Sequence, residues 1–422
     1  MKDNIQKSEH SYFRSLKIEG INCFRDKQVL DLSDGKGNFS PWTLILGDNG
    51  TGKTTILKIL DRLQPSTFFQ NDGEFHPIIS TYQKFKNADL VEISLEMDNN
   101  ELKEYQYIPQ SKVSGTIRAN GNSNFPFLLS YGATRRMRKA PNLSKSESGN
   151  LRITTLFDES IELINVEEWL LQKYTISRIS EKNAKIKFRN EYSFIKKMLI
   201  DFLPDVKDFR VKLIDENNSD LIIEVDTSYG WVNLRDLSFG YQTTTALLVD
   251  IAANMMDNFS NSKRPLSEPV IILIDEIDLH LHPKWQRKVI DKLSQYFPKA
   301  QFIVTAHSPL ILQVAQDKNA NIVVCRKEDD RVVIDNNPES VKGWRIDQIL
   351  TSDLFDVESS RSPKTQESVD KYFILKGKDK LKPSEIKELQ GLTPLVKTVY
   401  PIQDNPSDLD IRLQKFSEKY LK

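Results

Sequence analysis

The sequence predicts an α/β fold with a mixed sheet flanked by helices, an antiparallel β portion, a helical insertion and a helical C-terminal tail. Two observations support the central sheet. Apolar runs at residues 42–46, 271–274 and 302–304 have the length and composition of buried parallel strands. Polar residues and helix-like segments follow these runs, as in strand–helix–strand units whose ligands bind at the carboxyl ends of the strands.

A phosphate-binding loop is predicted at residues 47–54, which read Gly-Asp-Asn-Gly-Thr-Gly-Lys-Thr between a strand-like and a helix-like segment. Glycines allow backbone N–H groups to surround phosphates, and the N-terminus of the following helix favours anions. We expect Lys53 to reach the terminal phosphates and the Thr54 hydroxyl to coordinate Mg²⁺. A chance match within a loop is the alternative, and both flanking segments argue against it. The other expected nucleotide-binding residues are Asn49, Gly50, Gly52 and Thr55.

Two carboxylates, Asp275 and Glu276, directly follow the apolar run 271–274. At the end of a parallel strand, Asp275 would hold Mg²⁺ through water, and Glu276 would orient and deprotonate an attacking water. Adjacent acids can instead reflect a charge preference at a helix N-terminus. The upstream phosphate loop favours the catalytic interpretation.

His307 follows the third apolar run, in the segment 301–309. One predicted helix, at about residues 283–297, separates this strand from the acidic pair, as a single crossover connection requires. At that strand end the imidazole can hydrogen-bond the γ-phosphate. An ordinary loop histidine is the alternative.

A second anion site is predicted at residues 237–242, which read Leu-Ser-Phe-Gly-Tyr-Gln before a helix-like segment. Ser238 and Gly240 would present a hydroxyl and an amide at the N-terminus of that helix. One chain has no evident need for two phosphate sites, so the second is expected to serve the nucleotide of another subunit.

Taken together, these motifs resemble those of ABC-type P-loop ATPases of the SMC/RecF/OLD branch, and the strand–loop opening at residues 13–24 has the form seen there. The motifs extend over roughly residues 12–310. A narrower similarity, to PtuA-type ATPases of Septu and retron anti-phage systems, rests on three stretches: residues 129–136, 275–283 and 343–352.

The resemblance implies an ATPase head that uses ATP and Mg²⁺ and hydrolyses ATP to ADP and phosphate. It further implies a head-to-head homodimer or higher homo-oligomer, in which the signature of one protomer closes over the ATP of the other. In Septu-like systems a separately encoded HNH nuclease is the partner, and the ATP cycle of the dimer would regulate it. Two departures affect the site. Tyr241 stands where this branch more often has Glu or Gln, and no clear glutamine loop precedes the signature. Arg135 or Arg136 would then approach the phosphates electrostatically.

Composition excludes some classes of protein. Acidic and basic residues balance at 59 each, so no global field attracts nucleic acid. Cys23 and Cys325 are the only cysteines, too few for a disulfide framework, and a reducing cytoplasm fits best. The sequence has no apolar run near the roughly 20 residues of a membrane span and no secretion signal at its start. We therefore expect a cytoplasmic protein without a membrane partner.

Five regions are predicted along the chain. Residues 1–11 are expected to be disordered. Residues 12–150 form one ATPase lobe with the phosphate loop and the antiparallel β portion, and residues 209–340 form the other with the signature, the acidic pair and His307. Residues 151–208 form the helical insertion, in which a helix from about Ser160 is expected. Residues 341–422 form a helical tail for oligomer or partner docking.

Three further stretches have a composition that bears on function. A basic island includes Arg135, Arg136, Arg138, Lys139, Lys145 and Arg152; it could bind phosphate backbones or be a solvated loop. A lysine-rich stretch at 182–189 is expected to be an exposed face. Residues 408–410 read Asp-Leu-Asp, as in Toprim nucleases, but a helix start precedes them and a dozen residues follow, so no nuclease site is predicted.

The main alternative function is a RecF-like DNA-repair ATPase that clamps DNA directly, with nucleic acid as its partner. A third alternative is a scaffold that ATP holds in one conformation, with negligible hydrolysis of ATP. The sequence does not decide between a dimer and a larger assembly.

Overall fold

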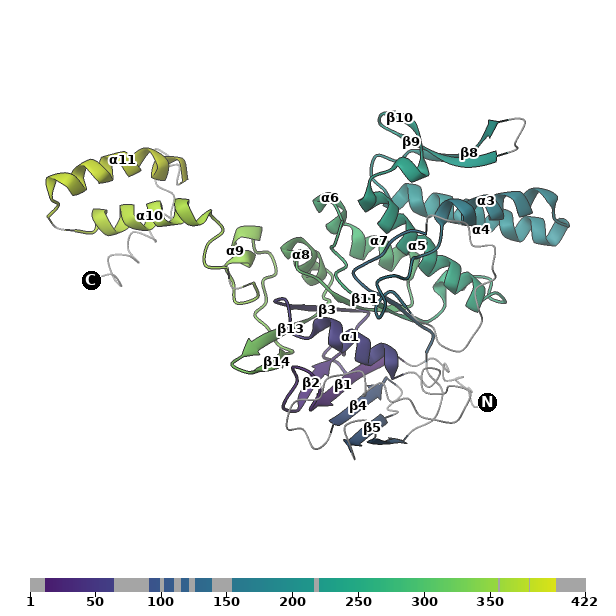
Figure 1. Cartoon of the computed structure of the whole chain (residues 1–422), viewed down its shortest axis with the longest axis horizontal. Coiled ribbons are helices and arrows are strands. Elements are labelled where there is room, and N and C mark those ends of the chain that lie inside the picture. The colour runs from purple at the N-terminus through teal and green to yellow at the C-terminus, as the bar shows by residue number, and fades with distance from the viewer. Residues whose placement is uncertain are drawn as a thin grey trace, which may run out of the picture. The chain divides into compact units, whose positions relative to one another are not determined.

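The chain is described from a computed structural model, in which residues 12–63, 91–98, 102–109, 115–120, 126–138, 154–215, 220–355, 357–378 and 380–399 are placed. The expected disorder of residues 1–11 and the Asp-Leu-Asp triplet at 408–410 lie outside these residues. The chain divides into two compact units, Met1–Ile349 and Leu350–Lys422, which are described separately (Figure 1).

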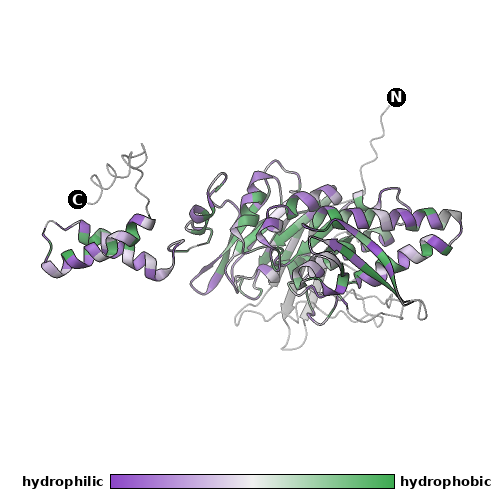
Figure 2. Cartoon of the chain, turned by 90° about the horizontal axis from the view of Figure 1, so that it is seen from above, coloured by the Kyte–Doolittle hydropathy of each residue, from purple (hydrophilic) through white to green (hydrophobic). Residues whose placement is uncertain are grey.

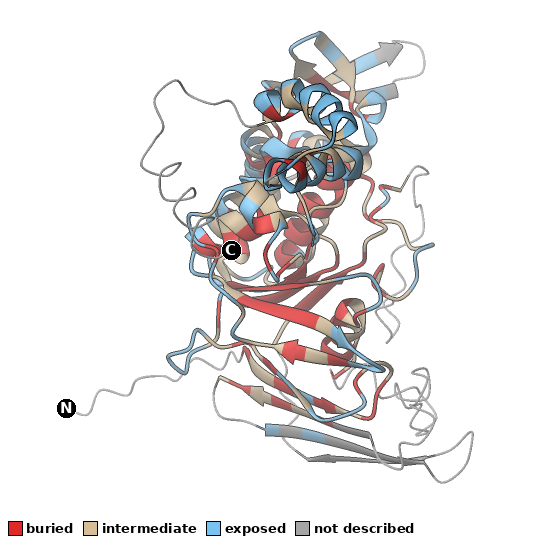
Figure 3. Ribbon diagram, turned by 90° about the vertical axis from the view of Figure 1, so that its left-hand side faces the viewer, coloured by how far each residue is buried: buried red, intermediate tan, exposed pale blue. Residues whose placement is uncertain are grey.

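The centre of the first unit is a six-stranded sheet in the order β14-β13-β3-β12-β11-β7. All neighbouring pairs are parallel except β13 with β14. The middle strands are buried on both faces, which explains their continuous apolar sequence (Figure 3). This confirms the predicted α/β fold with a mixed sheet. The strands are β3 (Trp42–Gly47), β7 (Leu128–Tyr131), β11 (Val270–Ile274), β12 (Ala300–Thr305), β13 (Asn321–Glu328) and β14 (Arg331–Asp335).

An antiparallel sheet packs on one face of helix α1 (Lys53–Arg62), and the central sheet packs on its other face. Ile56 and Leu60 of α1 belong to one buried cluster with Leu16 of β1 and Leu273 of β11. Figure 2 shows hydrophobic residues gathered around the strands of this unit. The sheet has the order β2-β1-β4-β5-β6: β1 (Phe13–Glu19), β2 (Gln28–Asp31), β4 (Val91–Met97), β5 (Leu102–Pro109) and β6 (Gly115–Asn120).

The helical insertion consists of α3 (Val166–Ile179) and α4 (Lys182–Phe202). Helix α3 begins at Val166 and not near Ser160, because the Asn165 side chain accepts a hydrogen bond from the backbone N–H of Glu168 and so caps the helix there. A three-stranded antiparallel sheet, in the order β10-β9-β8, packs against α3. Its strands are β8 (Asp208–Asp215), β9 (Asp220–Thr227) and β10 (Gly230–Asn233).

Several of the other helices of the first unit lie between residues 234 and 317, among the segments that carry the predicted motifs. The single helix expected at 283–297 is wrong: a break at Arg287–Lys288 separates α6 from α7, and Lys288 has φ −120°. The break lets Trp285 of α6 and Ile290 and Leu293 of α7 all be buried. The helices of this part of the chain are η2 (Leu234–Asp236), α5 (Phe239–Asn258), η3 (Pro265–Ser267), α6 (Pro283–Gln286), α7 (Val289–Tyr296) and α8 (Pro309–Asp317).

The second unit is helical. Helix α9 (Ile346–Leu350) ends where this unit begins, and α10 (Pro363–Lys376) and α11 (Pro383–Val399) contact each other as a hairpin. Ser362 caps α10 by accepting from the backbone N–H of Thr365, with Pro363 in the first turn. Among the placed residues, no helix combines the length and the apolar character needed to cross a bilayer.

Gln301 ties the antiparallel sheet to the central sheet. Its side chain is fully buried, accepts from the backbone N–H of Phe13 at 2.9 Å and donates to the Phe13 carbonyl at 2.7 Å. Gln301→Met should lower the free energy of unfolding by about 2–4 kcal/mol, because it leaves two buried backbone groups unpaired. Urea denaturation would measure this, with Gln172→Met on the exposed face of α3 as the control. A Gln301→Met variant as stable as that control would contradict the bridging role.

Candidate functional site

The segment 47–54 forms a tight loop between β3 and α1, and glycine is sterically required at two of its positions. Gly47 has φ +137°, and an added Cβ would lie 2.3 Å from the Cys325 carbonyl oxygen. Gly52 has φ +80°, and its Cβ would lie 2.5 Å from Cys23 Sγ. Side chains at either position would therefore displace the loop. The two cysteines of the chain both support the phosphate-binding loop.

Lys53 is buried at the start of α1, directly beside the loop. Its Nζ donates to the carbonyl oxygens of Gly47 and Asp48, both at 2.7 Å. Burial lowers the pKa of this ammonium group, and nearby acidic side chains such as Asp275 act in the opposite direction. An ammonium group has three donors, so one donor remains for a phosphate oxygen. Asn49 and Gly50 are exposed at the tip of the loop, and the Thr55 hydroxyl accepts from Asn22.

The Asp275 carboxylate connects the first turn of α1 to the end of strand β12. Its Oδ2 accepts from the Thr54 hydroxyl at 2.7 Å, and its Oδ1 accepts from the Thr305 hydroxyl at 2.6 Å. Thr54 and Asp275 are 221 positions apart and meet because β12 lies between β3 and β11. A carboxylate and a hydroxyl in contact are hard oxygen donors of the kind that Mg²⁺ prefers, so this part of the site fits the expected metal.

Glu276 has a strained backbone. Its φ is +48°, which is uncommon outside glycine and costs free energy. Its N–H donates to the Thr305 hydroxyl at 2.7 Å, and its carbonyl accepts from Arg135 at 2.9 Å. Within the described residues, the hydrogen bonds recorded for Glu276 all use its backbone. The carboxylate is thus positioned by the backbone and can contact a water molecule.

Arg135 supports the turn that carries the acidic pair. It is buried, and its guanidinium donates to the carbonyl oxygens of Gly132, Asp275 and Glu276 at 2.6–2.9 Å. Burial lowers the pKa of Arg135 to about 10, and nearby carboxylates partly oppose this, so the side chain stays charged at neutral pH. The partners recorded for this guanidinium in the described residues are all backbone carbonyls. Arg136 is exposed, and a phosphate contact by either arginine stays untested.

Two of the supporting residues were not found from the sequence. In the sequence Thr305 is only the polar end of the strand before His307, yet its hydroxyl joins the carboxylate of Asp275 to the backbone of Glu276. Its sequence signal was a threonine at the end of an otherwise apolar strand. No sequence signal pointed to the role of Arg135 in fixing the acidic turn.

His307 lies two residues beyond Thr305, at the same edge of the sheet as the acidic pair. Its side chain is exposed, and its backbone N–H donates to Asp278 Oδ2 at 3.0 Å. The backbone bond fixes the loop between β12 and α8 against the turn after β11. Among the described residues no contact is recorded for the imidazole, so it can meet a ligand, and a role as γ-phosphate sensor remains a prediction.

The signature segment lies at the N-terminus of α5. Ser238 is exposed, and although it occupies the N-cap position its side chain makes no capping hydrogen bond. Gly240 lies against the turn after the acidic pair, because an added Cβ would be 2.6 Å from the His280 carbonyl oxygen. The Phe239 and His280 rings also meet edge to face at 4.8 Å. The signature and the acidic turn are therefore packed together in one chain.

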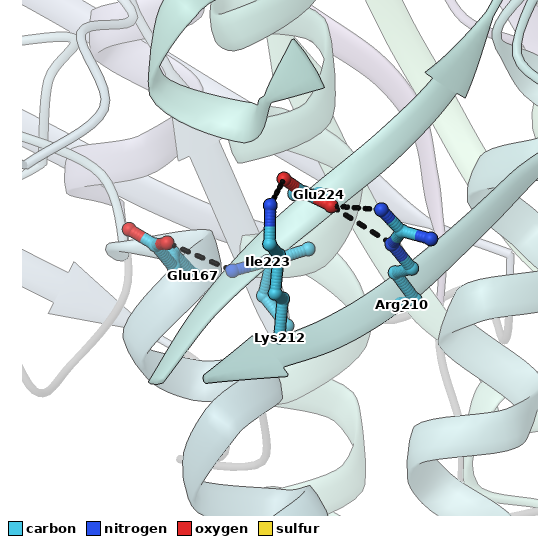
Figure 4. A network of polar contacts seen from close by, with 5 residues as sticks. All are labelled: Glu167, Arg210, Lys212, Ile223 and Glu224. Carbon is cyan, nitrogen blue, oxygen red and sulfur yellow. Dashed lines mark hydrogen bonds and ion pairs between the residues drawn. The ribbon is translucent and has the colours of Figure 1, made fainter. Parts of the chain in front are cut away.

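A buried glutamate of α3 bonds to the backbone of strand β9 (Figure 4). The same side chain holds the segment that leads into the signature. Glu167 of α3 is 0% exposed, and it accepts from the Ile223 backbone N–H at 2.9 Å and from Arg235 Nε. Gln242 donates to the carbonyl oxygens of Arg235 and Leu237. On the same strand as Ile223, Glu224 pairs with Arg210 and Lys212. The helical insertion is thereby linked to the signature.

The glycine loop is followed by Lys53, and the Thr54 hydroxyl donates to Asp275 of the acidic pair. Together these features define a P-loop nucleotide-binding protein. The chain belongs to the AAA family described as "AAA domain, putative AbiEii toxin, Type IV TA system", whose sequence profile matches residues 43–313. A second profile, "AAA domain", matches residues 15–61.

Among relatives, the chain is 29% identical over 394 residues to "Septu protein PtuA" of Bacillus mycoides (strain KBAB4), covering 90% of this chain and 51% of that protein. The chain thus spans about half the length of this relative. It is 26% identical to "Retron Vc95 probable ATPase" of Vibrio cholerae serotype O1 biovar El Tor, covering 67% and 68% of the two chains. The predicted similarity to PtuA-type ATPases is confirmed.

The comparison with solved structures finds an SMC head bound to the C-terminal winged-helix domain of ScpA. Its identity is 19% and its TM-score 0.44, over 77% of this chain and 97% of that one. The fold assignment rests on the chain's own sheet order and on the family match.

Thr305→Val should lower turnover of ATP by about 10–100-fold, as loss of an outer-shell partner of a ligand typically does, because Asp275 and the Glu276 backbone lose their shared hydroxyl. A steady-state phosphate-release assay would measure this, and affinity for a fluorescent ATP analogue should change little. Thr305→Ser, which retains the hydroxyl, is the matched control. Equal turnover in the valine and serine variants would contradict this role.

Proposed function

We propose that this chain binds and hydrolyses ATP with Mg²⁺, and that two copies close over two ATP molecules to regulate a separately encoded nuclease in anti-phage defence. One observation carries the proposal: the Asp275 carboxylate joins the Thr54 hydroxyl of the phosphate loop to Thr305 at the strand end that leads to His307. This arrangement combines a phosphate cradle, hard metal ligands and a candidate general base at one sheet edge.

Each residue has a distinct part in the proposed hydrolysis. Lys53 neutralises charge on the terminal phosphates, and Thr54 with Asp275 would hold the metal. When bound, Mg²⁺ stabilises the negative charge that develops on the phosphate oxygens. Glu276 orients the attacking water and accepts its proton. The His307 imidazole donates a hydrogen bond toward the γ-phosphate.

The exposed hydroxyl of the signature supports the proposed dimer. The Ser238 hydroxyl is exposed and is not used to cap its own helix, and no described contact joins it to Lys53 or Thr54 of the same chain. A helix N-terminus with an unused hydroxyl is suited to an anion. In a two-fold symmetric dimer, each signature would face the phosphate loop of the partner subunit.

The defence role rests on likeness to PtuA and to the retron ATPase. An HNH-type nuclease is the proposed effector, and the ATP state of the dimer would hold it inactive or release it. Coexpression with the neighbouring reading frame should protect cells from phage in plaque assays, and Lys53→Ala should remove that protection. If this chain protected cells without a second gene, the proposal of a separately encoded effector would be contradicted.

Glu276→Gln should lower the rate of phosphate release by about 10²–10⁴-fold, as loss of a general base does, and should accumulate an ATP-bound dimer. Mass photometry in saturating Mg–ATP would show that dimer. Adding Ser238→Arg should leave a monomer that still binds ATP. A Glu276→Gln protein that stays monomeric would contradict the shared site. If DNA alone strongly stimulated ATP turnover, the alternative function, a DNA-repair ATPase that clamps DNA directly, would be supported instead.

Glu167→Gln should weaken the ATP-dependent dimer by about tenfold, because a charge-assisted hydrogen bond is worth about 1.5–3 kcal/mol. The substitution removes the buried charge that pairs with Arg235 and so loosens the segment before Ser238. Analytical ultracentrifugation in the Glu276→Gln background would measure the dimer dissociation constant. Glu168→Gln, one position along α3, is the control. Unchanged dimerisation with lowered stability would limit Glu167 to a structural role.

A further inference from the structure

A second cavity lies in the first unit, away from the phosphate loop, the acidic pair and the signature. It has a volume of about 620 Å³ and lies between α4, the segment 260–267 after α5, and the end of α7. Helix α4 contacts both α5 and α7, and the three lie together in Figure 1. Ligand pockets typically measure roughly 300–1,000 Å³, so this cavity is large enough for a small organic ligand.

The wall of the cavity carries excess positive charge. Lys187, Lys263 and Arg264 all line it, and no ion pair is recorded for Lys263 or Arg264 in the described part of the chain. Glu191 is the only carboxylate among the lining residues, and its Oε2 is already paired with Lys173 at 2.7 Å, outside the cavity. Lys187 lies 4.0 Å from the other oxygen of Glu191. The free cations favour an anionic ligand.

An exposed aromatic ring, that of Phe194, lines the same cavity as these cations. The Phe194 side chain is 39% exposed, and its ring meets Tyr296 at 5.9 Å with an interplanar angle of 89°. Exposed aromatic rings next to cations are the feature on which nucleic-acid bases stack while their phosphates are neutralised. Glu191 Oε1 adds an acceptor that an amino group of a base could reach.

We infer that this cavity binds one nucleotide unit, with its base on Phe194, its phosphate on Lys263 and Arg264, and an amino group of the base donating to Glu191. A free mononucleotide and a residue of single-stranded nucleic acid present the same chemistry. The inference is independent of the proposed ATPase dimer, because none of these residues belongs to the ATP site.

The test uses the full chain without ATP and two probes: fluorescein-labelled dC12 by anisotropy and radiolabelled CMP by equilibrium dialysis. Lys263→Glu with Arg264→Glu should weaken binding at least tenfold, and for dC12 should reduce the salt slope by about 0.7, the value for one phosphate contact on a single strand. Phe194→Ala should weaken binding about fivefold or more, the loss of one stacked base. Because thymine lacks an amino group, dT12 should bind more weakly than dC12.

Two matched variants make the result specific. Lys197→Glu, an exposed change on α4 outside the cavity, should leave binding unchanged, and so should Lys53→Ala in the phosphate loop. Stabilisation by Mg–ATP in a thermal shift assay verifies the fold of the cavity variants and of Lys197→Glu, and far-ultraviolet circular dichroism verifies that of Lys53→Ala. Binding of dC12 ten times tighter than CMP would identify a strand as the ligand, and equal binding would identify the free nucleotide. Absence of binding by both probes, or binding that Lys53→Ala abolishes, would overturn the inference.

Discussion

The hydrogen bonds of Asp275 are the constraint on which the rest of this site depends. One carboxylate accepts from Thr54 after β3 and from Thr305 at the end of β12, so the ends of three adjacent strands are fixed by a single side chain. The strand order permits this, because parallel strands present their carboxyl ends at one edge. Thr305 extends this constraint to Glu276, because its hydroxyl also accepts from the Glu276 backbone N–H.

The turn after β11 is held in an unfavourable backbone conformation by its surroundings. Glu276 has positive φ, and the cost is offset by two backbone hydrogen bonds: its carbonyl accepts from Arg135, and its N–H donates to the Thr305 hydroxyl. A buried arginine is expensive to desolvate, and here its three hydrogen bonds to backbone carbonyls hold the turn in place. The arrangement leaves the Glu276 carboxylate uncommitted, as a general base requires.

The signature is part of the same structural unit as the acidic turn. Gly240 packs on the His280 backbone, while Glu167 and Gln242 fix the residues before and within the signature. A movement of either the turn or the helical insertion would therefore reach Ser238. This gives the proposed dimer a physical route by which an event at the helical insertion could bias ATP binding between subunits.

The sequence by itself determined the class of fold, the position of the phosphate loop, and the identity of the acidic pair, because these depend on local patterns: glycine spacing, and apolar strands that end in polar residues. It also located His307 and the signature as segments of interest. It misjudged the helix at 283–297, since a break that buries residues on two successive helices is decided by packing.

Only the tertiary structure showed that Thr305 and Arg135 support the acidic turn, that Glu167 holds the signature, and that cations from α4 and from the loop after α5 line one cavity with Phe194. These residues are far apart in the chain and have no motif of their own. Their roles arise from contacts between elements, and contacts of that kind leave no periodic or local signal in one sequence.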